Sequence, residues 1–168
     1  AKGEYLTFLD VDDEILPNKF HCLLKAFKKY PSATMAFGKV KKKYDSGVII
    51  NSVHGELLSG INICPNAGLL WLKQFQYNPA INSTMIKKKN ISKINEFPEN
   101  LLFGEDVAFN VLIGLRHDVV SVTETVGIYN RHSQSSLSKE NKFVPVELRY
   151  LNFYEQFSIP YFMKNNSK

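Results

Sequence analysis

Cysteine and long apolar runs are scarce in this sequence of 168 residues. Its two cysteines, Cys22 and Cys64, are too few for a disulfide framework, and neither stands at a metal-ligand spacing from a histidine, which argues against a zinc site. No run approaches the roughly 18–20 apolar residues that a membrane-spanning helix needs, and no signal-peptide pattern opens the chain. We therefore expect a cytoplasmic protein with reduced thiols.

The composition is that of an ordinary globular domain with an excess of positive charge. Hydrophobic residues make up 44% and charged residues 22% of a chain that is long enough to enclose one core. The net charge of +5 and the isoelectric point near 9.1 favour an anionic partner, such as a nucleotide diphosphate, an acidic polymer or a lipid surface. The basic runs at 39–43 and 87–89 carry no nucleic-acid-binding motif, so we expect no nucleic-acid partner.

The order of the apolar patterns predicts an α/β fold with a mixed sheet flanked by helices over residues 1–140. A tail at 141–168 is expected to form an aromatic amphipathic helix, interrupted before Pro160. The chain opens directly on a buried-looking strand, so we expect an upstream part of the domain to be missing. The patterns predict strands at 5–9, 34–44, 48–50, 79–86, 119–122 and 126–129, helices at 17–30, 69–75, 90–95, 107–115 and 144–163, and polar loops at 51–66 and 131–139.

The most informative local feature is a cluster of acids directly after the strand predicted at 5–9. Asp10, Asp12, Asp13 and Glu14 bring like charges to one strand end, where they repel unless a cation neutralises them. Asp-x-Asp spacing lets two carboxylates reach one ion, and Mg²⁺ or Mn²⁺ prefers oxygen ligands that it shares with substrate phosphates. An acidic turn that caps the next helix is the alternative. The apolar strand before the cluster and the helix after it favour a metal-diphosphate site.

A second acidic pair, Glu105 and Asp106, opens the helix predicted at 107–115. The helix dipole and the free backbone N–H groups at such a position tend to keep carboxylates ionised. An ionised carboxylate that faces a cleft can take a proton from an attacking hydroxyl. The alternative is the ordinary preference for acids at helix starts, worth about 0.3–1 kcal/mol.

A third candidate site is the polar segment that contains Arg131 and His132. The arginine can pair with a diphosphate, and the histidine can complete a metal shell. Taken alone, the segment is typical of a surface loop.

Together, and in this order, these motifs resemble those of the family-2 inverting glycosyltransferases, which have the GT-A fold. The matching stretches are GEYLTFLDVDD at 3–13, LPNKF at 16–20, FGEDVAF at 103–109 and YNRHS at 129–133. The resemblance implies a nucleotide-sugar donor, most commonly a UDP-sugar, an acceptor hydroxyl on a glycan or lipid-linked molecule, and Mg²⁺ or Mn²⁺. The family's βαβ region, which binds the nucleotide base, has no counterpart here, so the resemblance is to a fragment.

The resemblance also assigns roles near the donor. Asp12 would be the direct metal ligand of the Asp-x-Asp motif, and Asp10 would lie nearer the ribose or a metal-bound water. Asp13 would support the turn or contact the donor sugar. Arg131 and His132 would lie over the diphosphate, with His132 adding a contact to the metal.

On the acceptor side, Asp106 would match the catalytic base and Glu105 would orient it or bind the acceptor. Trp71 and Asn82 would line the acceptor site, although core packing is the alternative use of the tryptophan. With the lysine- and asparagine-rich composition, this suggests bacterial surface polysaccharide or glycoconjugate synthesis by a cytoplasmic enzyme. Its aromatic tail could contact the inner face of the membrane peripherally.

Two other classes stay open. Haloacid-dehalogenase-like phosphatases also end a strand in Asp-x-Asp, with the first aspartate, here Asp10, as a nucleophile toward phosphate. Their pattern does not continue with Asp13 and Glu14, and it needs a later acidic pair that Gly104, Glu105 and Asp106 match poorly. A glycan-binding module that keeps the GT-A shape without catalysis is the non-enzyme alternative.

Overall fold

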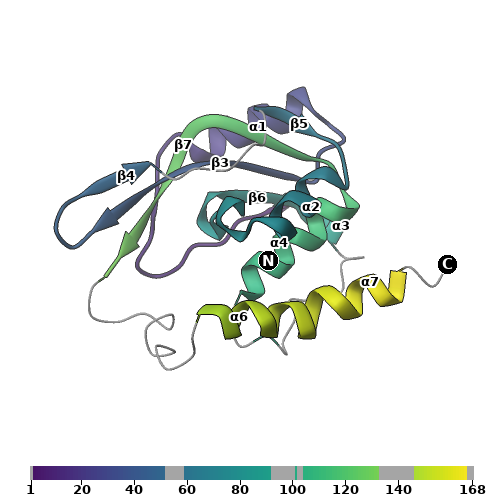
Figure 1. Ribbon diagram of the computed structural model, residues 1–168. Coiled ribbons are helices and arrows are strands. Elements are labelled where there is room, and N and C mark those ends of the chain that lie inside the picture. The colour runs from purple at the N-terminus through teal and green to yellow at the C-terminus, as the bar shows by residue number, and fades with distance from the viewer. Residues whose placement is uncertain (1, 52–58, 92–100, 102–103, 133–145, 166–168) are drawn as a thin grey trace.

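The computed structural model describes residues 2–51, 59–91, 101, 104–132 and 146–165. Over these residues the chain forms a seven-stranded mixed sheet with helices packed on it (Figure 1). This arrangement confirms the α/β class predicted from the sequence. The finer GT-A assignment, the division near residue 140 and the missing upstream region stay predictions.

Two long parallel strands form the centre of the sheet, and each is flanked by short antiparallel strands. The long strands are β3 (Met35–Tyr44) and β7 (Val119–Arg131), and the short ones are β1 (Tyr5–Leu6), β2 (Glu14–Ile15), β4 (Ile49–Asn51), β5 (Gly60–Asn62) and β6 (Thr84–Lys87). β6 and β4 pair with opposite ends of β3, and β5 and β2 pair with opposite ends of β7. β1 pairs with β6, which gives the order β1-β6-β3-β7-β2.

One face of the sheet is covered by α1 (Lys19–Lys29). Leu23 and Phe27 recur one helical turn apart and pack with Val120 of β7 in a buried apolar cluster. The helix stops just before Pro31, which has no N–H to continue the hydrogen-bond ladder. The helix predicted at 17–30 is therefore confirmed, with its start two residues later.

The other face carries α2 (Asn66–Lys73) and α4 (Glu105–Arg116). These helices touch backbone to backbone at Gly68, where an added Cβ would lie 2.4 Å from the backbone nitrogen of Leu115. Only glycine permits so close an approach.

Trp71 of α2 lies inside the core that these helices form with the sheet. Its side chain is 0% exposed and its ring meets Phe37 of β3 edge-on, with 5.7 Å between ring centroids. The sugar-stacking role predicted for Trp71 is therefore wrong, because no part of its ring reaches the surface. Core packing, the alternative use, is what the structure shows.

The C-terminal segment runs as one helical rod through α6 (Val146–Phe153), the π-helical turn η4 (Tyr154–Ser158) and α7 (Ile159–Asn165). Phe153 and Phe157 anchor the rod in the core. The interruption predicted before Pro160 is a widened turn rather than a break, which accommodates the missing N–H and the bulk of the proline ring. None of the helices in the described ranges combines the length and the apolar character needed to cross a membrane.

Several elements differ from the sequence-based expectation. The strand expected at 5–9 is reduced to β1, and β2 and β5 were missed because stretches of two and three residues show no periodicity. The strands expected at 119–122 and 126–129 are one strand, β7.

The strand expected at 79–86 begins instead with a 3-10 turn. The remaining short helices are η1 (Phe75–Tyr77), η2 (Ile81–Ser83) and α3 (Lys88–Ile91). Residues 52–58, 92–95 and 133–139, which belong to two predicted loops and one predicted helix, lie outside the described residues.

Candidate functional site

The acidic cluster forms a tight turn between β1 and β2. The N–H of Asp13 donates to the carbonyl of Asp10 at 3.1 Å, and Val11 is fully exposed at the tip. β2 follows at once and pairs with β7, which fixes the turn against the end of the sheet. Asp10 and Asp12 therefore face solvent, whereas Asp13 is only 8% exposed.

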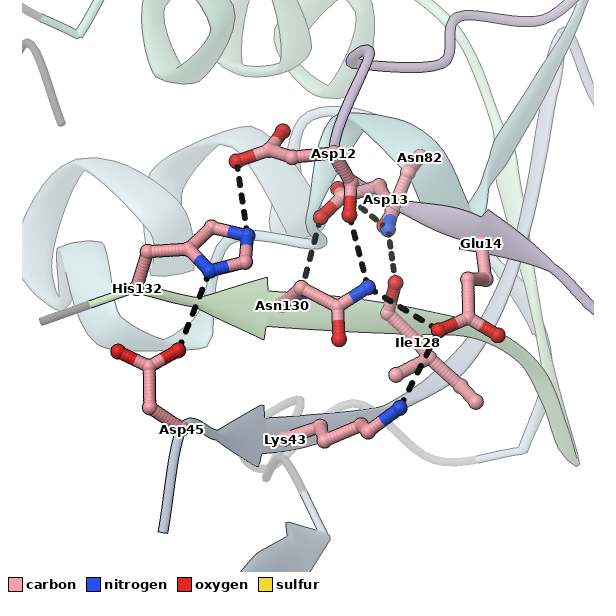
Figure 2. Close-up of polar contacts among 9 residues, drawn as sticks. All are labelled: Asp12, Asp13, Glu14, Lys43, Asp45, Asn82, Ile128, Asn130 and His132. Atoms are coloured by element: carbon pink, nitrogen blue, oxygen red, sulfur yellow. Dashed lines mark hydrogen bonds and ion pairs between the residues drawn. The ribbon is translucent and has the colours of Figure 1, made fainter. Parts of the chain in front are cut away.

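Asp13 holds three segments together (Figure 2). Its Oδ1 accepts from the backbone N–H of Asn130 at 3.1 Å, and its Oδ2 accepts from Nδ2 of Asn82 at 2.7 Å. Burial, together with the charges of Asp10 and Asp12, raises the pKa of this carboxyl to about 6, although the two hydrogen bonds lower it. Both oxygens are thus engaged inside the protein, which favours the turn-supporting role over contact with a donor sugar.

Asn82 is a buried residue that holds Asp13 in place, and it does not lie on the protein surface. Its side chain is 1% exposed, and Nδ2 also donates to the carbonyl of Ile128 at 3.3 Å. The acceptor contact predicted for Asn82 is therefore corrected, because a buried amide that holds Asp13 has no surface to offer an acceptor.

Lys19 is a supporting residue that sequence reasoning missed. It is fully buried at the start of α1, and its Nζ donates to the carbonyl of Asn82 at 2.7 Å and to the hydroxyl of Thr7. Burial lowers the pKa of its amine to about 8. A lysine beside a helix start gives no sequence signal for this role.

Asp106 lies at the start of α4, after Gly104, which ends the preceding segment in the left-handed conformation with φ of +81°. Its Oδ1 accepts from the N–H of Val107 at 2.8 Å. Burial raises the pKa of Asp106, and the charges of Glu105 and Asp10 add to the rise. The helix start therefore does not hold the pKa of Asp106 down, because burial outweighs the backbone hydrogen bond.

The effect of Asp10 on Asp106 means that the two acidic motifs lie close enough for their charges to interact. Packing explains the approach: the ring of Phe8 meets Phe109 edge-on, with 6.0 Å between centroids. Asp106 lies one helical turn before Phe109, on the same side of α4, and Asp10 follows Phe8 by two residues. The structure therefore brings Asp10 and Asp106 together, with Glu105 exposed beside them.

The segment before β6 is clamped onto α4. Asn110 Nδ2 donates to Oδ1 of Asn78 at 2.7 Å and to the carbonyl of Pro79 at 3.0 Å. Asn82 follows and binds Asp13, so this clamp connects the helix that carries Asp106 to the acidic turn.

His132 lies between two carboxylates, as Figure 2 shows. Its Nε2 is 3.9 Å from Oδ2 of Asp12, and its Nδ1 is 3.1 Å from Oδ1 of Asp45, in the turn between β3 and β4. The predicted proximity of His132 to the acidic motif is thus present. Asp45 was missed, since an Asp-Ser-Gly hairpin turn explains its presence without a function.

Arg131, the last residue of β7, has its guanidinium carbon 6.0 Å from the centre of the Tyr44 ring. Next to it on the strand, Asn130 donates through Nδ2 to the carbonyl of Asp12 at 2.7 Å and to Oε1 of Glu14 at 3.1 Å. Glu14 also forms an ion pair with Lys43 at 3.6 Å. The end of β7 therefore holds the acidic turn through the contacts of Asn130 with Asp12 and Glu14.

The side chains at the acidic turn fit a cation that also binds substrate phosphates better than one held by protein ligands alone. Among the described residues, no three His, Cys, Asp or Glu side chains converge to hold a metal ion. Asp12 and His132 nevertheless offer an oxygen and a nitrogen that face each other. Mg²⁺ commonly takes one or two carboxylates and completes its shell with waters and substrate phosphates. The pair fits a cation of that kind.

Comparisons with known proteins point to one class of enzyme. No family model matches the chain. It is similar to an uncharacterized glycosyltransferase of Rickettsia conorii and to another of Rickettsia felis, each 29% identical over 119 residues. The match covers 71% of this chain but 18% of each relative, so the chain spans less than a fifth of the curated relatives' length. The chain is thus similar, over most of its length, to proteins named as glycosyltransferases.

Proposed function

We propose that the chain is part of a glycosyltransferase that moves a sugar from a nucleotide-diphosphate donor to an acceptor hydroxyl, with inversion at the anomeric carbon. The packing of Phe8 against Phe109 carries the proposal, because it brings the segment that leads into the acidic turn alongside the helix that begins at Glu105 and Asp106. The similarity to two glycosyltransferases supports the same class, and the motif resemblance supports family 2 and the GT-A fold.

Asp106 acts as the general base. Its carboxylate takes the proton of the acceptor hydroxyl while that oxygen forms a bond to the anomeric carbon. The bond from this carbon to the diphosphate oxygen breaks, and its electron pair leaves with the nucleoside diphosphate. Attack opposite the leaving group inverts the configuration. Because burial raises the pKa of Asp106, its carboxylate is a stronger base than an exposed aspartate.

The acidic turn and the end of β7 bind the donor. Asp12 and His132 would hold Mg²⁺ or Mn²⁺, which when bound supplies Lewis-acid neutralisation of the departing diphosphate. Arg131 would offer a second positive charge to the diphosphate, and Asp10 would lie nearer the ribose or a metal-bound water. We propose a UDP-sugar as the donor and a glycan or lipid-linked molecule as the acceptor. The product would belong to a bacterial surface polysaccharide.

The phosphatase alternative is disfavoured by the residues that follow Asp12, because Asp13 and Glu14 do not continue that family's pattern.

The proposal is tested by incubating the protein with a panel of nucleotide-diphosphate sugars, with and without Mn²⁺. We expect release of the nucleoside diphosphate from one of them that needs Mn²⁺ and speeds up when a glycan acceptor is added. Release of inorganic phosphate from phosphomonoesters would instead establish the phosphatase. Glycan binding without turnover of any donor would establish the non-catalytic module.

A further inference from the structure

The hairpin formed by β3 and β4 exposes an unusual run of aliphatic side chains. It extends beyond the helices that cover the sheet (Figure 1). Val48, Ile49 and Ile50 are consecutive, and 52%, 55% and 49% of their respective surfaces are exposed. Single exposed aliphatic residues are common, but three in a row on one projecting hairpin mark a surface that something covers.

The strand register shows which of these side chains share a face. Lys42 lies opposite Ile50 of β4 and beside Tyr129 of β7, and Tyr44 lies beside Arg131. Val48 stands two residues before Ile50, so it points to the same side. We call Lys42, Tyr44, Val48, Ile50 and Arg131 the hairpin face. Ile49 lies opposite Lys43, on the reverse side.

Positive charge accompanies the exposed aliphatic residues on both sides of the hairpin. Lys42 and Arg131 belong to the hairpin face, whereas Lys41 and Lys43 alternate with Lys42 and lie on the reverse side with Ile49. The acidic residue of the hairpin, Asp45, is engaged with His132, and the Glu14 carboxylate is engaged with Lys43. The hairpin therefore presents hydrocarbon and ammonium groups on the same surface, at Lys42 and Ile50 in directly opposite positions.

We propose that the hairpin face docks on an anionic lipid bilayer. Val48 and Ile50 enter the boundary between headgroups and acyl chains. The Lys42 side chain lies along the same surface and extends its ammonium to the lipid phosphates, as amphipathic lysines do at membrane interfaces. Each lysine near an anionic membrane surface is worth about 1 kcal/mol, or about fivefold in binding. An acidic polymer would use the lysines but would leave the aliphatic side chains in water.

The register also relates the hairpin face to the candidate site. Tyr129 lies beside Lys42 in the sheet, whereas Asn130, which holds the acidic turn, lies beside Lys43 and points to the reverse side. The contacts that hold the acidic turn are therefore made from the reverse side of the hairpin. The docking does not depend on the proposed glycosyl transfer.

The test is co-sedimentation of the protein with phosphatidylcholine vesicles, with and without phosphatidylglycerol. We expect binding only to the vesicles with phosphatidylglycerol, and weaker binding as salt is added. The double variant Val48→Ser and Ile50→Ser should weaken binding by at least about tenfold, since it removes two inserted aliphatic side chains. Lys42→Gln should weaken it by about fivefold.

Two matched controls locate the contact. Ile49→Ser changes an equally exposed isoleucine on the reverse side of the hairpin, and Ile159→Ser changes one that is 51% exposed on the C-terminal rod. Both should bind vesicles like the unmodified protein, and circular dichroism should show all variants folded. Failure of the unmodified protein to bind, an equal loss in Ile49→Ser, or a loss confined to Ile159→Ser would overturn the proposal.

Discussion

His132 bridges the candidate donor site and the hairpin turn, because its Nδ1 lies 3.1 Å from Asp45 while its Nε2 faces Asp12. Histidines that bind metals usually hold their second nitrogen on a carboxylate or a carbonyl, which fixes the ring and the tautomer. Asp45 stands in that relation to His132, although it comes from a turn far away in the sequence.

Replacing Asp45 by Asn should therefore weaken Mn²⁺ binding even though Asp45 itself does not face Asp12. Loss of such an outer partner typically costs about 10–100-fold in metal affinity. Calorimetric titration of the protein with Mn²⁺, in the presence of a nucleoside diphosphate, measures the effect. Ser46→Ala, in the same turn, is the control and should bind Mn²⁺ normally. Unchanged affinity in Asp45→Asn would remove Asp45 from the site.

The buried Asp13 should make stability depend on pH. Its pKa rises from 3.8 to about 6 on folding, so the folded protein binds this proton more tightly than the unfolded chain. The resulting contribution to the free energy of unfolding is fully present below about pH 4 and is lost as the pH rises through 6. Urea unfolding gives the free energy of unfolding of the unmodified protein and of Asp13→Asn. The difference between the two values should change as the pH rises from about 4 to 6. Parallel profiles of the two proteins would contradict the burial of this carboxyl.

Lys19 should matter for stability far more than its neighbours on α1. Lys19→Met leaves the carbonyl of Asn82 and the hydroxyl of Thr7 without their donor, and each unpaired buried group costs about 1–3 kcal/mol. We expect a loss of about 2–4 kcal/mol in the free energy of unfolding. Lys25→Met, at an exposed position of the same helix, should stay within about 0.5 kcal/mol of the unmodified protein. Equal stabilities of the two variants would rule out the supporting role of Lys19.

The sequence predicted correctly those features that depend only on the residue pattern within one short segment. The apolar spacing of Leu23 and Phe27 predicts α1, and the acids at Glu105 and Asp106 mark the start of α4. Clustered charge likewise identified Asp10 and Asp12 as a candidate site.

What the sequence could not show are contacts between distant segments. Whether Asn82 faces solvent or Asp13 depends on how the segment before β6 is clamped to α4 by Asn78 and Asn110. Sugar stacking and core packing could not be distinguished for Trp71 for the same reason, since its burial depends on how closely α2 and α4 approach each other.

The most direct test of the central claim is sugar transfer by Asp106→Asn, measured together with donor binding. With its base removed, the protein should bind Mn²⁺ and the nucleotide-sugar normally but transfer the sugar about 10²–10⁴-fold more slowly. Glu105→Gln, at the exposed neighbouring position, should reduce the rate of sugar transfer much less. Transfer by Asp106→Asn at the rate of the unmodified protein would contradict the account.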